Sequence, residues 1–160
     1  MCIPVHVPVE IIANQQSEEN LPDLNPVLED GYTPFHLAAM FNNITLFEFL
    51  IPHVEDPFEN SDNEDRISPI ELAIKYGNAE IVELFSQHFM QCEEDYEFGL
   101  IISSCYGHKQ FAKFFINQMK DPFPAVLAAK YNALIMEQNA FADLMENYIA
   151  LYLFSRIFVV

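Results

Sequence analysis

The chain has 160 residues, the size of about one domain. Hydrophobic residues make up 51% of it, with 15 Phe, 7 Tyr and only 4 Gly, which excludes wholesale disorder and argues against many tight hairpins. Seven Lys and Arg stand against 24 Asp and Glu, a formal net charge of −17. A surface with this much negative charge repels phosphate groups. Nucleic acids are therefore excluded as partners, and anionic membranes are poor partners.

The acidic residues are concentrated at the N-terminal end. Residues 1–65 contain 13 Asp and Glu and no Lys or Arg, and Arg66 is the first basic residue. The remainder contains 11 acidic and 7 basic residues, a net charge of −4. Two interpretations stay open: the charge keeps the chain soluble, or it steers a partner with a basic segment toward this end.

Residues 1–28 contain four Pro and an acidic polar stretch, which predicts an extended or partly disordered lead-in with a short helix at Val9–Asn14. The three cysteines, Cys2, Cys92 and Cys105, form no CxxC pair. An odd count without such pairs fits a reducing compartment, so we expect an intracellular protein, cytoplasmic or nuclear. The spacing of Cys and His matches no zinc pattern, and we expect no metal or cofactor.

From residue 29 the chain repeats itself. Gly31–Asn43 aligns with Arg66–Asn78 at an offset of 35 residues, and each segment is followed by a second apolar pattern, at 44–50 and 79–85. The repeated unit is therefore a turn, a helix, a short turn and a second helix.

The residues at the helix ends support this interpretation. Thr33 and Ser68 can cap the first helix of each unit, and a Pro follows each of them at the first helical position. Gly77 can end that helix in the left-handed conformation, and Asn42 takes its place in the first unit.

Thr33–Ala38 resembles the TPLHxA signature of ankyrin repeats, with Phe in the Leu position, and Tyr76–Val82 resembles the family's second-helix opening. The resemblance implies an all-α, ankyrin-repeat solenoid of helix-turn-helix units. Its structural motif residues here would be Gly31, Thr33, Pro34, His36, Ser68, Pro69, Gly77 and Gly107.

Two degenerate units follow the clear ones. Cys105–Phe115 aligns at an offset of 30, with its turn expected near 97–99, and Pro124–Asn132 aligns with Pro69–Gly77 at an offset of 55, which predicts a second helix at about 136–148. The expected repeats are thus 29–62, 63–94, 95–121 and 122–147. The apolar segment 148–160 is expected to be a buried cap, with a membrane anchor as the alternative.

No hydrolase, metalloprotease or phosphate-loop motif occurs in the sequence. The resemblance implies that His36 is a structural hydrogen-bonding residue. Cys105 and His108 are three residues apart, so a nucleophilic pair stays open as the enzymatic alternative, although no third group to orient it is evident.

The resemblance also implies that the first helices and turn tips line a concave binding surface. Two residues directly precede each helix-ending residue, and the second of them is aromatic in all four units. Aromatic residues are enriched in protein interfaces. The alternative is that the ring only shields the helix end. The residues predicted to bind a partner are Tyr32, Met40, Phe41, Ile67, Lys75, Tyr76, Cys105, Tyr106, Lys130 and Tyr131.

The sequence therefore predicts a non-enzymatic module that binds a protein partner, as a small inhibitor or adaptor. A fragment or subunit of a larger enzyme or effector, and an adaptor tethered to a membrane through the apolar C-terminus, are the alternatives.

Overall fold

The computed structural model describes residues 23–62 and 64–157. The helix predicted at Val9–Asn14 lies outside this range. The described part contains eight α-helices, one short 3-10 helix and no strand, which confirms the all-α class. The helices are α1 (Pro34–Met40), α2 (Ile44–Leu50), η2 (Ile51–His53), α3 (Pro69–Tyr76), α4 (Ala79–Phe89), α5 (Glu93–Tyr106), α6 (Lys109–Ile116), α7 (Phe123–Ile135) and α8 (Asn139–Ile157).

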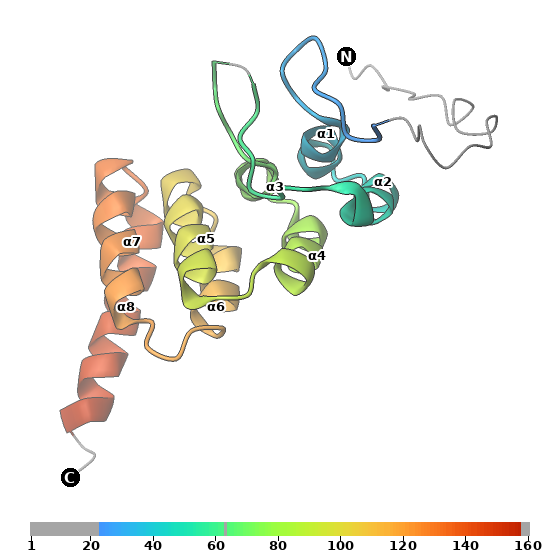
Figure 1. Cartoon of the computed structure of the whole chain (residues 1–160). Coiled ribbons are helices and arrows are strands. Elements are labelled where there is room, and N and C mark those ends of the chain that lie inside the picture. Colours follow the sequence, from blue (N-terminus) through green and yellow to red (C-terminus); the bar gives the residue numbers. More distant parts are fainter. Residues whose placement is uncertain (1–22, 63, 158–160) are drawn as a thin grey trace.

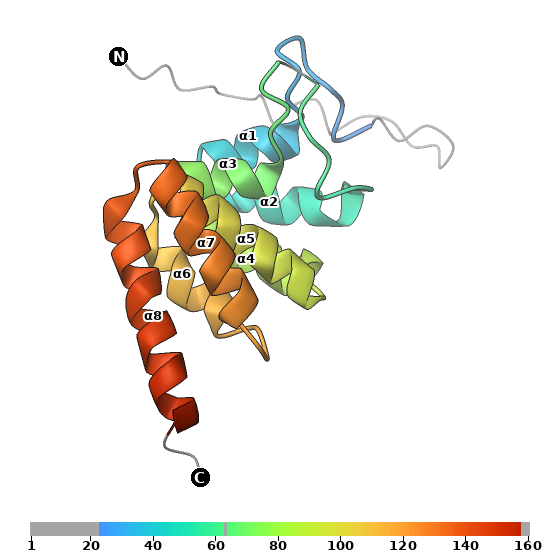
Figure 2. The same cartoon turned by 90° about the vertical axis from the view of Figure 1, so that its left-hand side faces the viewer.

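The helices form four consecutive pairs that stack into a solenoid (Figure 1). The first helices of the pairs, α1, α3, α5 and α7, pack on one another in that order. Each second helix follows its first helix after a short turn, and α8 extends well past the stack (Figure 2).

Every pair turns through one residue in the left-handed conformation. The backbone N–H of the next residue donates to the carbonyl five residues before it, a bond that closes the end of the first helix. The left-handed residues are Asn42 (φ 54°), Gly77 (75°), Gly107 (73°) and Glu137 (58°). The corresponding bonds are Asn43 to Ala38 (3.0 Å), Asn78 to Ala73 (2.9 Å), His108 to Ser103 (3.0 Å) and Gln138 to Ala133 (2.7 Å).

These turns correct the predicted register of the fourth repeat. Glu137 follows Gly77 by 60 residues, not the predicted 55, so Ala129 and not Pro124 corresponds to Pro69. The reason is that α7 continues to Ile135, since no glycine ends it earlier. The second helix therefore begins at Asn139, and residues 148–157 continue α8 rather than forming a separate segment.

Long loops precede α1 and α3 and project from one end of the stack (Figure 1). We call these loops the fingers: residues 23–33 and 54–68, of which 63 is not described. In place of a finger, α5 and α7 each carry six additional residues at their start, 93–98 and 123–128, relative to α3. The turn predicted near 97–99 is therefore wrong. A capping box between Cys92 and Asp95 starts α5 early, and three acidic residues in its first turn favour that helix end.

The core runs through the stack between the first and second helices. Phe35 and Phe47 stack with ring centroids 4.3 Å apart, and Phe85 lies 6.4 Å from both. One position of the second helix is buried in every repeat, with at most 1% exposed: Leu50, Phe85, Phe115 and Met145. Beside Phe115 the chain has Gly99, the residue that corresponds to Pro69.

Gly99→Ala should destabilise the protein, although alanine favours helix by about 1 kcal/mol over glycine. An added Cβ would lie 2.5 Å from Cζ of the fully buried Phe115, and such overpacking typically costs about 1–3 kcal/mol. Urea unfolding measures the change. Adding Phe115→Leu should recover part of the loss, because the two sites are in contact. Unchanged or increased stability of Gly99→Ala would contradict the packing described here.

Candidate partner-binding surface

The two residues before each left-handed turn form a row across the stacked first helices. The corrected register makes the members of this row, from the first repeat to the fourth, Met40–Phe41, Lys75–Tyr76, Cys105–Tyr106 and Ile135–Met136. Four of these side chains are about half to three-quarters exposed: Phe41 (63%), Tyr76 (54%), Ile135 (76%) and Met136 (48%). The row is therefore apolar and open along most of its length.

The middle of the row is held by contacts between neighbouring repeats. Lys75 Nζ lies 5.9 Å from the ring centroids of both Tyr76 and Tyr106, within cation–π range. The Tyr106 hydroxyl donates to Glu71 Oε1 at 3.2 Å. Burial, and then the charge of Glu71, raise the pKa of Tyr106 to about 12, so its phenol stays protonated and keeps this bond.

The environment of Cys105 does not activate a thiol. Burial, and next the negative charge of Glu71, raise the pKa of Cys105, and Asn132 Nδ2 lies 3.4 Å from its sulfur. A nucleophilic cysteine needs a lowered pKa. His108 Nε2 donates instead to the carbonyl of Lys75 at 2.9 Å. Each of the two side chains thus contacts a neighbouring repeat.

Two residues predicted for the surface in the fourth repeat lie outside the row. Lys130 forms an ion pair with Glu146 of α8. Tyr131 is 60% exposed but stands at the position of Glu71, five residues before Met136. Ile135 and Met136 were not predicted, because the repeat alignment places the end of the helix at Asn132. The 30-residue spacing between successive turns, counted from Gly107, would have found them.

The finger positions Tyr32 and Ile67, predicted to bind a partner, differ in exposure. Tyr32 is half-buried, with its ring 5.9 Å from that of His36. Ile67 is only 4% exposed, so it is not a surface residue. Its N–H donates to Ser61 Oγ and its carbonyl accepts from the Ser61 N–H, both at 3.0 Å, and these bonds close the base of the second finger.

His36 fastens the second finger to α1. Its Nε2 donates to the carbonyl of Glu59 at 3.1 Å, and its Nδ1, 2.8 Å from Thr33 Oγ1, accepts from that hydroxyl and completes the capping box. This arrangement needs a neutral ring. Burial lowers the pKa of His36 below its ordinary value, against the opposing backbone hydrogen bonds.

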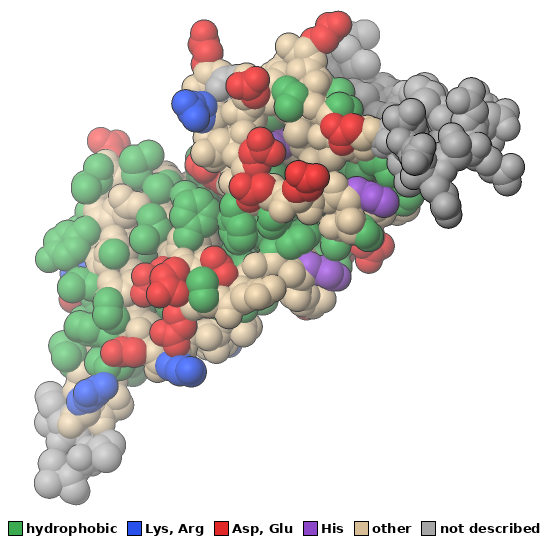
Figure 3. Space-filling model, viewed as in Figure 1, with side chains coloured by type: hydrophobic (Ala, Val, Ile, Leu, Met, Phe, Trp, Pro, Cys, Tyr) green, Lys and Arg blue, Asp and Glu red, His purple; other side chains and the backbone are tan. Residues whose placement is uncertain are grey.

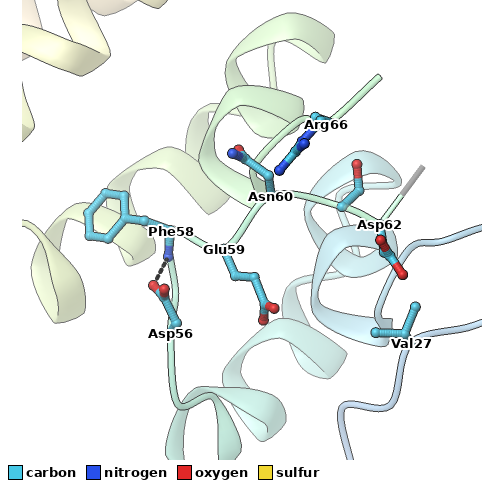
Figure 4. A pocket seen from close by; sticks show the side chains of 8 residues that line it. Val27, Asp56, Phe58, Glu59, Asn60, Asp62 and Arg66 are labelled. Atoms are coloured by element: carbon cyan, nitrogen blue, oxygen red, sulfur yellow. Dashed lines mark hydrogen bonds between the residues drawn. The ribbon is translucent and has the colours of Figure 1, made fainter. Parts of the chain in front are cut away.

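The two fingers lie side by side and enclose an acidic hollow. The Asp62 N–H donates to the carbonyl of Gly31 at 2.7 Å, which joins them. The hollow has a volume of about 670 Å³, and its charged lining residues are Asp56, Glu59, Asp62 and the basic Arg66 (Figure 4). The fingers carry nine Asp and Glu and one basic residue, Arg66, and acidic side chains gather over this end of the molecule (Figure 3).

The chain matches the family model of ankyrin repeats (three copies) over residues 9–93, just over half of its length. It therefore belongs to the ankyrin-repeat family, whose repeats are modules of protein–protein interaction and whose members are generally non-enzymatic and usually intracellular. The match ends where α5 begins, which is where the fingers give way to longer helices. A comparison with curated proteins finds no match.

Within residues 23–62 and 64–157, no group of three or more His, Cys, Asp and Glu side chains could hold a metal ion. The helices of this same part are not long and apolar enough to cross a membrane.

The stability of the folded chain should fall as the pH drops below 6.5, the ordinary pKa of histidine. Because the folded state lowers the pKa of His36, the unfolded chain binds this proton first, so the contribution is complete above pH 6.5 and is lost on acidification. His36→Gln should flatten the dependence of the unfolding free energy on pH below 6.5. His88→Gln, which removes an exposed imidazole, is the control. A variant at His36 with the parental slope would contradict this account.

Proposed function

We propose that this chain is a non-enzymatic binding module that holds a protein partner on the row from Met40–Phe41 to Ile135–Met136. The observation that carries the proposal is the recurrence of aromatic or apolar side chains at one position of four stacked repeats, exposed in three of them (Phe41, Tyr76 and Met136). Rigid aromatic and aliphatic side chains that stand together on a surface are the usual anchors of protein interfaces. The contacts among Lys75, Tyr76 and Tyr106 support it, because residues ordered before binding lose less entropy on binding.

The charge of the fingers supports a partner with a basic segment. The hollow, whose charged lining residues are Asp56, Glu59, Asp62 and Arg66 (Figure 4), lies between the loops at the end of the stack that carries α1 and α3 (Figure 1). Opposite charges across an interface raise the association rate and set the orientation of the partner. The module would then act as an adaptor, or as an inhibitor that covers the basic segment of its partner.

Tyr76→Ala combined with Ile135→Ala should abolish capture of the partner from native cell extract. Both side chains are more than half exposed, so the unfolding free energy should change by no more than about 0.5 kcal/mol each. Hot-spot residues contribute about 2 kcal/mol or more, which corresponds to a loss of affinity of roughly 30-fold for each. Phe49→Ala, an exposed ring on α2, is the matched control and should keep full capture. Capture by the double variant at the parental level would place the interface elsewhere.

Glu59→Gln combined with Asp62→Asn should weaken the same capture and reduce its sensitivity to salt. The backbone groups that join the fingers are unchanged in this variant, so the fold is kept while two charges of the hollow are removed. The decrease should appear mainly in the association rate, measured by surface plasmon resonance with the captured partner. A partner whose binding is indifferent to salt and to this variant would exclude the basic segment while leaving the row intact.

A further inference from the structure

The row has an aromatic ring in each of its first three repeats: Phe41, Tyr76 and Tyr106. The first helices of these repeats pack on one another, and packed helices are about 8–10 Å apart. The three rings therefore follow one another at about this spacing. The ammonium of Lys75, which lies 5.9 Å from the centroids of both tyrosine rings, agrees with it.

The spacing of the rings selects among the backbone conformations that a bound segment can have. A polyproline II helix has three residues per turn and rises about 3.1 Å per residue, so every third side chain returns to the same side after about 9.3 Å. In a β-strand every second side chain returns to the same side, after about 6.6 Å. A polyproline II segment therefore places one side chain over each ring, whereas a strand falls out of step with the repeats.

The second repeat also offers hydrogen-bond donors beside its ring. Tyr76 is 54% exposed and Lys75 is exposed, so the Tyr76 hydroxyl and the Lys75 ammonium can both donate to a bound segment. The hydroxyl of Tyr106 differs, because it donates to Glu71 Oε1 at 3.2 Å. An α-helix uses its own backbone carbonyls internally, whereas a polyproline II segment has no internal hydrogen bonds and keeps its carbonyls available. The donors thus favour a polyproline II segment over a helix.

The charges beside the row indicate what flanks the bound residues. Burial first, next the charge of Glu71 and, more weakly, that of Asp65 in the second finger raise the pKa of Tyr106. Both carboxylates are therefore close enough to the third ring to act on it, and the second finger adjoins the row. The two fingers together carry nine acidic residues and one basic residue. This charge is complementary to a segment with Arg or Lys next to its apolar residues.

We propose that the row takes a proline-rich segment of its partner in the polyproline II conformation, with proline at every third position and basic residues beside the prolines. This inference rests on the proposed function and names the class of ligand. Successive prolines lie on Phe41, Tyr76 and Tyr106, the Tyr76 hydroxyl donates to a carbonyl of the segment, and the basic residues face Asp65 and the fingers. Aromatic surfaces suit such segments, because polyproline II is formed before binding and loses little entropy.

Fluorescence anisotropy of labelled synthetic peptides, titrated with the 160-residue chain, tests the proposal. The first probe has proline at every third position and an arginine at each end. Its controls are an isomer in which the prolines are grouped together and a version with glutamate in place of each arginine. The first probe should bind at least about tenfold more tightly than either control, because grouped prolines meet one ring and the fingers repel glutamate.

Tyr76→Phe should weaken binding of the first probe by roughly two- to tenfold, the effect of one lost hydrogen bond. Tyr131→Phe removes the hydroxyl of a 60% exposed tyrosine outside the row, so it is the matched control and should bind like the parent. Circular dichroism spectra and melting curves establish that both variants are folded before binding is measured.

Equal binding of the grouped isomer overturns the proposal, as do parental affinity in Tyr76→Phe and absence of binding of the first probe at about millimolar concentration. Tighter binding of a helical peptide with leucine at every seventh position and the same arginines also overturns it, because the row would then take a helix. Capture from extract separates the two proposals. If Tyr76→Ala combined with Ile135→Ala abolishes capture while the first probe does not bind, the row still holds a protein, through another kind of segment.

Discussion

The fold depends on how each repeat is fixed to the one before it. The side chain of the residue after the left-handed turn contacts the C-terminal end of the first helix of the previous repeat. Asn78 Nδ2 donates to the carbonyls of Ala39 (2.7 Å) and Met40 (3.0 Å), and His108 Nε2 donates to that of Lys75 (2.9 Å). The last carbonyls of a helix have no partner within it, so these bonds satisfy groups that stacking would otherwise leave unpaired. Stacking and helix capping are thus one interaction.

The same interaction explains why the row from Met40–Phe41 to Ile135–Met136 is regular. Because each turn sits on the end of the previous helix, the two residues before it occupy the same place in every repeat and lie next to their counterparts. The amide end of the Gln138 side chain lies over Gly107, and glycine is favoured there because the backbone has a positive φ of 73°. Residues in the row can vary without disturbing this contact, which suits a surface for recognition.

The sequence predicted what its strongest local signals encode. Thr33 and Ser68 cap helices and are followed by proline, and both predicted helix starts agree with α1 and α3. The position of the turn in the third repeat was predicted correctly, because Gly107 marks it. Its beginning was missed, since a cysteine with Asp95 replaces the usual cap of the repeat.

The fourth repeat was misplaced for a different reason. Glu137 adopts the left-handed conformation, which costs a residue other than glycine about 1–2 kcal/mol, so local propensity gives no indication of the turn there. Packing of α8 along α7 overrides that preference. The site prediction failed in the same place: Tyr131 has the residue type expected of the row, but stacking assigns that position to Met136. Likewise the burial of Ile67 follows from the hydrogen bonds of the finger base, which cannot be read from a repeat alignment.

The ordered loops at the acidic end hold many like charges close together. Mutual repulsion among them opposes folding. A disordered acidic segment would attract a basic partner over the same distance, but it would lose conformational entropy when the partner bound. The bonds from His36 to the carbonyl of Glu59 and from the Asp62 N–H to the carbonyl of Gly31 fix the fingers beforehand. Both use the backbone and leave the carboxylates facing outward. The entropy is therefore lost during folding, where the aromatic core around Phe35 and Phe85 compensates for it, and the loss is not repeated on binding.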